Sequence, residues 1–150
     1  MINPELIVKL RELKDQSGSY ALNKNIPIST IDSPPFSNIR ELILCDAGVH
    51  SSSELTDILI ERYKIPAITL RGGLTLVDNM LNASESSQEI WIKGFLSRFA
   101  HVVILRTFDH CNQYYPDTIK YFTRRDISAT YHPNQTSALI EVVSRNSKPR

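Results

Sequence analysis

Residues 45–52, "CDAGVHSS", gather side chains and backbone groups that could do chemistry. Cys45 follows an apolar run, and a glycine, a histidine and two serines come directly after it. Amides of a loop that leads into a helix can converge on an anion, and the same field favours a nucleophilic thiolate. The pattern therefore predicts Cys45 as a nucleophile and His50 as a donor to a bound anion. The expected anion-binding residues of this loop are Asp46, Ala47, Gly48, Val49, Ser51 and Ser52.

A structural role for Cys45 is equally open. Short loops with glycine and serine are common after buried strands, and free cysteines are often small buried residues at strand ends. The loop alone does not decide between a reactive thiol and a packing residue.

A second polar stretch, "RTFDHCNQYYPD" (106–117), also follows an apolar run. Asp109 and His110 could form an acid–base pair, because an aspartate can orient and charge an imidazole. A Cys45–His110 dyad of thiolate and base is a further possibility. Arg71, before two glycines, could help to bind the anion. The competing interpretation is that Asp, His and Asn are ordinary turn formers, and that Arg71 is a solvated side chain.

Strands and helices must position these candidate residues, and the apolar patterns of the sequence predict that strands alternate with helices. Such alternation is typical of a parallel sheet with helices on both faces. We therefore expect an α/β three-layer sandwich with a four-stranded or slightly larger, mainly parallel sheet, plus an N-terminal helix from Pro4 that ends before Ser17. The expected strands are 42–44, 65–70, 101–105 and 127–131, and the expected helices are 52–63, one near Leu74, 84–99, 116–125, and 134–146 with Asn134 as its cap.

The length of 150 residues fits a single domain, 1–150. Within it we expect the N-terminal helix and an irregular extension in 1–40, with one short strand near 26–31, and the strand–helix repeats in 41–146. In such a sheet the loops that leave the carboxyl ends of the strands build the ligand site. This places the Cys45 loop, Arg71 and His110 along one edge.

Composition excludes several classes of function. The formal charge is +1, from 17 basic and 16 acidic side chains, and lacks the basic excess expected of a nucleic-acid-binding protein. The sequence has no apolar run near the roughly 20 residues that a membrane span needs, and its N-terminus does not resemble a secretory signal. Its two cysteines have no metal-ligand spacing. We expect a cytoplasmic protein without metal or cofactor, whose partner is a small anionic substrate or another protein; its oligomeric state stays open.

The segment "CDAGVHS" (45–51) resembles the active loop of rhodanese-like domains, Cys-x-x-Gly-x-Arg-Ser. The likeness continues through "ITLRGGL" (68–74) and covers residues 42–76. It implies that Cys45 accepts a sulfane sulfur as a persulfide, that Gly48 forms the turn of the loop, and that His50 replaces the usual basic residue. The first half of that family's domain has no counterpart before Cys45.

"CDAGVHSS" is also similar to the loop Cys-x-Ala-Gly-Met-Ser-Thr-Ser of phosphotransferase-system B subunits, which implies a phosphocysteine carrier. "FDHCN" (108–112) looks like the Asp-Glu-Ser-Asn loop of low-molecular-weight tyrosine phosphatases, with Asp109 as the acid. Those phosphatases need an arginine six positions after the cysteine, where this chain has Ser51. Without a guanidinium that holds the phosphoryl oxygens, phosphate-ester hydrolysis is disfavoured.

Two main hypotheses follow. The first is a divergent rhodanese-like protein that transfers sulfur through a Cys45 persulfide, with His50, Asp109 and His110 as further catalytic candidates. The second is a catalytically inactive interaction or regulatory module of the same fold. A phosphocysteine carrier or a phosphatase-like protein is third.

Overall fold

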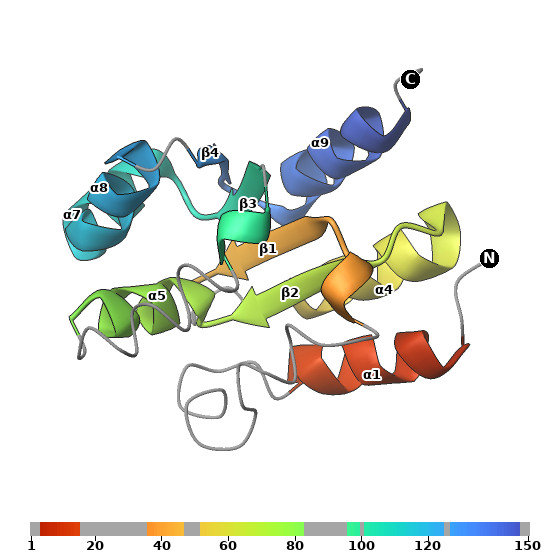
Figure 1. Cartoon of the computed structure of the whole chain (residues 1–150). Helices are drawn as coiled ribbons and strands as arrows, with labels where there is room; N and C mark the ends of the chain where they lie inside the picture. Colours follow the sequence, from red (N-terminus) through yellow and green to blue (C-terminus); the bar gives the residue numbers. More distant parts are fainter. Residues whose placement is uncertain are drawn as a thin grey trace.

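A computed structural model of the chain describes residues 4–15, 36–46, 52–82, 96–99, 101–124 and 127–147. Its centre is a sheet of four parallel strands in the order β2-β1-β3-β4 (Figure 1). The strands are β1 (Glu41–Cys45), β2 (Ala67–Arg71), β3 (His101–Leu105) and β4 (Ser128–His132). All four expected strands are present, and the predicted fold class is confirmed.

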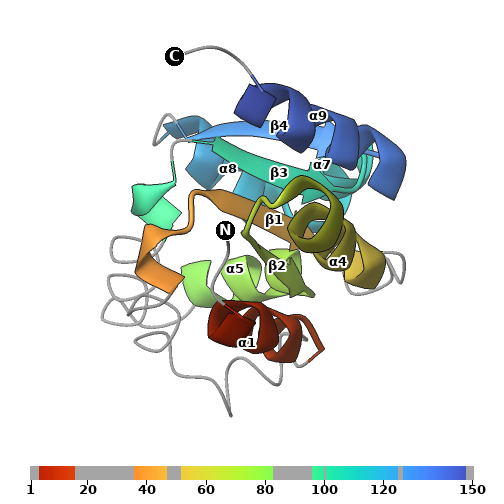
Figure 2. The same ribbon diagram turned by 90° about the vertical axis from the view of Figure 1, so that its right-hand side faces the viewer.

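Helices cover both faces of this sheet and one of its edges (Figures 1 and 2). One face is packed by α4 and α9, and the other by α5, α7 and α8. The N-terminal α1 packs against α4 and the edge strand β2. The helices are α1 (Pro4–Asp15), α4 (Ser52–Tyr63), α5 (Gly73–Leu81), α7 (Phe108–Tyr114), α8 (Pro116–Arg124) and α9 (Gln135–Ser147). None of the described helices is long and apolar enough to cross a bilayer.

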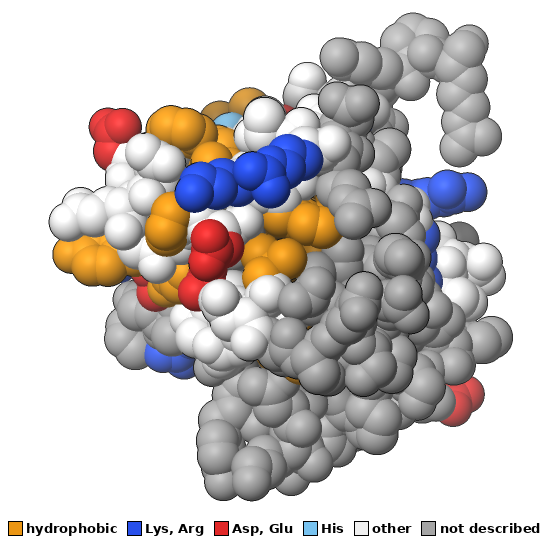
Figure 3. Space-filling model, turned by 60° about the vertical axis from the view of Figure 1, so that its left-hand side comes forward, with side chains coloured by type: hydrophobic (Ala, Val, Ile, Leu, Met, Phe, Trp, Pro, Cys, Tyr) orange, Lys and Arg blue, Asp and Glu red, His pale blue; other side chains and the backbone are white. Residues whose placement is uncertain are grey.

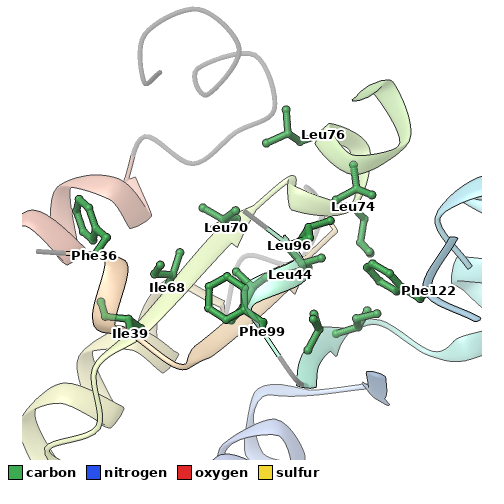
Figure 4. Close-up of a cluster of buried hydrophobic side chains, with 14 of the residues drawn as sticks. Phe36, Ile39, Leu44, Ile68, Leu70, Leu74, Leu76, Leu96, Phe99 and Phe122 are labelled. Atoms are coloured by element: carbon green, nitrogen blue, oxygen red, sulfur yellow. The ribbon is translucent and has the colours of Figure 1, made fainter. Parts of the chain in front are cut away.

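The apolar core lies in two layers because alternate strand residues point to opposite faces. Leu42 and Leu44 of β1 pack under α5 and α8, where Figure 4 shows Leu44 among aromatic and aliphatic side chains that include Phe99 and Phe122. Ile43 and Cys45 point the other way. Their cluster, beneath α4 and α9, consists of Ile43, Cys45, Leu55, Leu59, Ala67, Val103, Leu105, Ala138 and Val142.

Side-chain caps start two of the helices. Asn134 accepts a hydrogen bond from the Ser137 amide at 2.9 Å, which confirms its predicted role before α9. Thr107 accepts one from the His110 amide at 3.2 Å and starts α7. Sequence patterns do not predict this short helix, because its Asp, His and Asn residues are also typical of turns.

The predicted helix 84–99 is wrong at its C-terminal end. Residues 96–98 form a single 3₁₀ turn, in which the Phe99 amide bonds to the Leu96 carbonyl at 3.1 Å. This tight turn puts Leu96 and Phe99 in the core just before β3, where burial outweighs helical continuation. Residues 83–95 and the expected strand 26–31 lie outside the described residues.

Gly72 and Gly73 join β2 to α5 in a narrow space. Gly72 has a φ of 78°, in the left-handed region that favours glycine. A Cβ on Gly73 would lie 2.8 Å from Leu44 Cδ2 and 3.0 Å from Leu70 Cβ. The paired glycines are thus required by the close approach of α5 to the sheet.

A polar contact ties the first strand to the last helix. Glu41 begins β1 and is only 6% exposed. Its carboxylate accepts hydrogen bonds from the Arg145 guanidinium and, at 2.9 Å, from the Asn146 side chain. Because a buried carboxylate is costly without partners, α9 completes the environment of β1.

Candidate functional site

The carboxyl ends of β1 and β3 form the topological switch point of the sheet, and we call the region just outside them the crevice. From β1 the chain crosses to β2 on one side, whereas β3 lies on the other side of β1. Ligands of open α/β sheets bind at such points, outside the strand ends. Here Asp46 follows β1 and Arg106 follows β3, so both side chains belong to this crevice.

Asp46 is the centre of the crevice. Its side chain is 13% exposed, and its Oδ2 lies 2.6 Å from His110 Nε2 and 3.3 Å from Arg106 Nε. An ionised carboxylate only accepts hydrogen bonds, so the imidazole donates from Nε2. The neutral ring therefore keeps its lone pair on Nδ1, where it can take up a proton.

Helix α7 and the residue after it surround the His110 ring. The Thr107 cap fixes the first turn of α7, which carries His110. The rings of Tyr114 and Tyr115 lie with their centroids 4.7 and 6.4 Å from the His110 centroid. This packing leaves the His110 side chain 28% exposed, so the imidazole remains open to a ligand.

Tyr115 links this crevice to α5. Its hydroxyl lies 3.4 Å from Thr75 Oγ1. Burial raises the pKa of Tyr115, with the negative charge of Asp46 adding to the effect and the Thr75 hydrogen bond opposing it. The phenol is therefore protonated at neutral pH and is available as a hydrogen-bond donor.

Basic side chains follow the carboxyl ends of the strands near Asp46. Arg71 ends β2 in register with Cys45, Arg106 follows β3, and His132 ends β4. The Nε of Arg106 is used by Asp46, and the rest of its planar guanidinium carries four further N–H donors. With a side chain that is 38% exposed, Arg106 can present these donors to an anion.

The surface over α5, α7 and α8 also carries basic side chains. Seen from this side, a strip of Lys and Arg lies beside hydrophobic and acidic side chains (Figure 3). Phe108 and Tyr114, in α7, are 48% and 59% exposed.

The predicted nucleophile is placed away from this crevice. Cys45 has no exposed surface and packs under α4 and α9 with Leu55 and Leu105. Residues 47–51, which hold the predicted His50 and Ser51, lie outside the described residues. Ser52 is the first residue of α4, so the loop does enter a helix N-terminus as expected.

The predicted partners of His110 are arranged differently. The carboxylate that contacts its ring belongs to Asp46, 64 residues earlier in the chain. Asp109 is exposed in the first turn of α7. Cys45 points to the α4/α9 face, whereas α7 lies on the opposite face, so the fold separates Cys45 from His110.

Cys111 lies next to His110 in the chain and is fully buried. Burial raises the pKa of its thiol to about 11, with Asp46 adding to the shift and Arg106 opposing it. Cys111 therefore stays protonated at neutral pH and acts as a packing residue. Among the described residues there is also no group of three His, Cys, Asp or Glu side chains that could hold a metal ion.

Sequence reasoning missed Arg106, Tyr115 and the side-chain role of Asp46, which had been assigned to the backbone of an anion loop. One signal was present. Asp46 and Arg106 are each the first polar residue after the apolar run of a strand, and neighbouring parallel strands end at the same edge.

Comparison with protein-family models, with curated proteins and with solved structures gave no significant match. The resemblances to rhodanese-like domains, phosphotransferase subunits and tyrosine phosphatases therefore stay predictions that rest on the quoted residues. Function has to be argued from the side chains of this chain alone.

Proposed function

We propose that the chain binds a small anionic ligand at the carboxyl ends of β1 and β3, and that His110 exchanges a proton with it. The observation that carries this proposal is the Asp46 carboxylate between His110 Nε2 and Arg106 Nε, at 2.6 and 3.3 Å. A buried carboxylate that orients both an imidazole and a guanidinium at a switch point is typical of a binding site.

Each side chain has a definite task in this proposal. Arg106 binds the anion through its Nη groups, because a guanidinium matches carboxylate, sulfate and phosphate oxygens in pairs. His110 accepts or donates a proton at Nδ1. Asp46 holds the ring in one tautomer and stabilises the imidazolium that forms when Nδ1 is protonated.

Sulfur transfer requires an accessible cysteine thiol. A persulfide on Cys45 needs its Sγ to reach a sulfur donor in solution, whereas Cys45 is 0% exposed among aliphatic side chains. This burial favours the hypothesis of a domain without sulfurtransferase activity. We therefore place the chemistry of the site on His110 and assign a packing role to Cys45.

Calorimetric titration with phosphate, sulfate and thiosulfate at low ionic strength tests the binding step. We expect at least one of these anions to bind, and R106Q to weaken that binding at least about tenfold, equivalent to about 1.4 kcal/mol. Arg62, exposed in the last turn of α4, provides the matched control R62Q, which should bind like the wild type. Absence of binding to all three anions, or equal binding by R106Q and wild type, would contradict the proposal.

A separate experiment addresses Cys45. After incubation with thiosulfate, intact-mass measurement should show no added sulfur on the wild type, and C45A should bind the anion as tightly as the wild type. An added sulfur atom that disappears in C45A would instead establish the persulfide, and with it the rhodanese-like hypothesis.

A further inference from the structure

A second polar cluster lies beneath α9, over the starts of β3 and β4. Helix α9 crosses these two strands (Figure 2), and an open cavity of about 640 Å³ lies between them. His101 and Ser128, the first residues of β3 and β4, line it from the sheet. Ile140, Glu141 and Arg145 line it from α9. The volume falls in the range of small-molecule sites, and the cluster includes none of Asp46, Arg106 and His110.

The hydrogen bonds of this cluster fix where its protons lie. Thr130 Oγ1 donates to Glu141 Oε2 at 2.7 Å, since a carboxylate only accepts. The same Thr130 oxygen lies 3.0 Å from His101 Nε2 and, its own proton being used, accepts from that nitrogen. His101 Nε2 is also 3.3 Å from Glu141 Oε2. The imidazole proton is thus on Nε2.

The position of the His101 proton determines the direction of the hydrogen bond with Ser128. In its neutral form, His101 has its proton on Nε2 and therefore only a lone pair on Nδ1. Ser128 Oγ lies 3.0 Å from Nδ1 and must donate to it. A serine hydroxyl that donates to an imidazole, which a carboxylate orients from its other nitrogen, is the arrangement of an activated nucleophile. Ser128 is exposed, so a substrate can reach its oxygen.

Glu141 keeps its charge in this setting. Burial acts to raise its pKa, but the Thr130 hydrogen bond and the neighbouring histidine side chains outweigh burial and lower the pKa. Arg145 Nη1 lies 3.2 Å from its Oε2, and His132 Nε2 lies 3.3 Å from its Oε1. An ionised carboxylate is therefore present to stabilise the imidazolium that forms when Nδ1 takes a proton.

We propose that this cavity is a hydrolytic site for small carboxylic esters, with Ser128 as nucleophile and His101 as general base. Ser128 Oγ bonds to the carbonyl carbon while its proton passes to His101 Nδ1. The ester C–O bond then breaks, and that proton goes to the departing alkoxide. Water next attacks the acyl group, giving one proton to Nδ1, and the acyl C–O bond breaks as this proton returns to Ser128 Oγ.

The lining of the cavity suggests which esters it takes. Ile140 is 63% exposed and presents an apolar wall. Arg145 also lines the cavity, with its guanidinium bonded to Glu41 and Glu141. An apolar wall suits an uncharged ester of a short acid. Thr130 and Glu141 act through His101 and are positioning residues.

Hydrolysis of p-nitrophenyl acetate, together with labelling by a fluorophosphonate and mapping of the modified peptide, tests this proposal. We expect the wild type to hydrolyse the ester faster than buffer and to carry the label on Ser128. S128A and H101Q should lose at least about 100-fold of that rate, the usual minimum contribution of a nucleophile and its base. E141Q should lower kcat with little change in KM.

Two other serines line the same cavity and give matched controls. Ser137 and Ser144 are both in the lining, and no hydrogen bond to His101 accompanies their described contacts. S137A and S144A should therefore still carry the label on Ser128. The proposal is overturned if the wild type neither hydrolyses nor is labelled, if the label maps to another residue, or if a folded S128A retains the rate.

Discussion

The contact between Asp46 and His110 is short and largely buried, so its energy can be measured directly. The two atoms are 2.6 Å apart, and the side chains are 13% and 28% exposed. Hydrogen bonds to charged groups contribute about 1.5–3 kcal/mol. Since part of His110 faces solvent, we reduce this to a coupling free energy of about 1–2 kcal/mol for a double-mutant cycle of D46N, H110N and the double variant.

The neighbouring contact offers an internal comparison. Arg106 Nε is 3.3 Å from the same carboxylate oxygen, and its side chain is 38% exposed. Exposed ion pairs contribute about 0.2–1 kcal/mol, so the cycle of D46N with R106Q should give less than half the coupling of the first cycle. The structure thus predicts the size of both coupling free energies and that the Asp46–His110 coupling is the larger.

Urea unfolding followed by circular dichroism measures both cycles. With an m-value of about 2 kcal/mol/M, a loss of about 2 kcal/mol in D46N moves the midpoint by about 1 M at unchanged m. The reasoning is refuted if the Asp46–His110 coupling is below about 0.3 kcal/mol, or if the Asp46–Arg106 coupling exceeds it.

Three further predictions concern stability and reactivity. Because the pKa of Glu141 is lowered in the folded state, its ionised carboxylate stabilises the fold above pH 4.5, and this contribution is lost in more acidic solution. The unfolding free energies of wild type and E141Q should therefore converge as the pH falls. A difference between them that does not change with pH would contradict this prediction. G73A should cost about 1–3 kcal/mol, measured by urea unfolding, because its Cβ meets the buried Leu44 and Leu70. The Cys111 thiol, whose pKa is raised to about 11, should react with iodoacetamide at pH 8 at least about 100-fold more slowly in the folded protein than in the unfolded chain. Equal rates in the two states would show that the thiol is accessible.

The sequence predicted the order of strands and helices well because its central strands, β1 and β3, contain continuous apolar runs. The segment 101–105 is buried from Val102 to Leu105 and has the expected bounds, and the Asn134 cap locates the start of α9. Such signals are local, since each comes from neighbouring residues that share one strand or one helical turn. Short elements such as α7 escape this reasoning because seven residues hold too little periodicity.

The candidate sites depend on distant residues, which one sequence cannot pair. Asp46 and His110 are 64 positions apart, and Ser128 and His101 are 27 apart. Sequence reasoning chose Asp109 as the partner of His110 because it is adjacent, although successive helical residues point about 100° apart. Cys45 is buried because helices cover both faces of β1, and the first side chain after the strand that reaches Arg106 and His110 is that of Asp46.

The contact between Glu41 and α9 also bears on how the chain is made. Glu41 is buried near the middle of the sheet, and its partners Arg145 and Asn146 are synthesised 104 and 105 residues later. A growing chain that has completed β1, β2 and β3 still holds an uncompensated carboxylate at the start of its central strand. The environment of Glu41 is therefore complete only after α9 has been synthesised and has packed against the sheet.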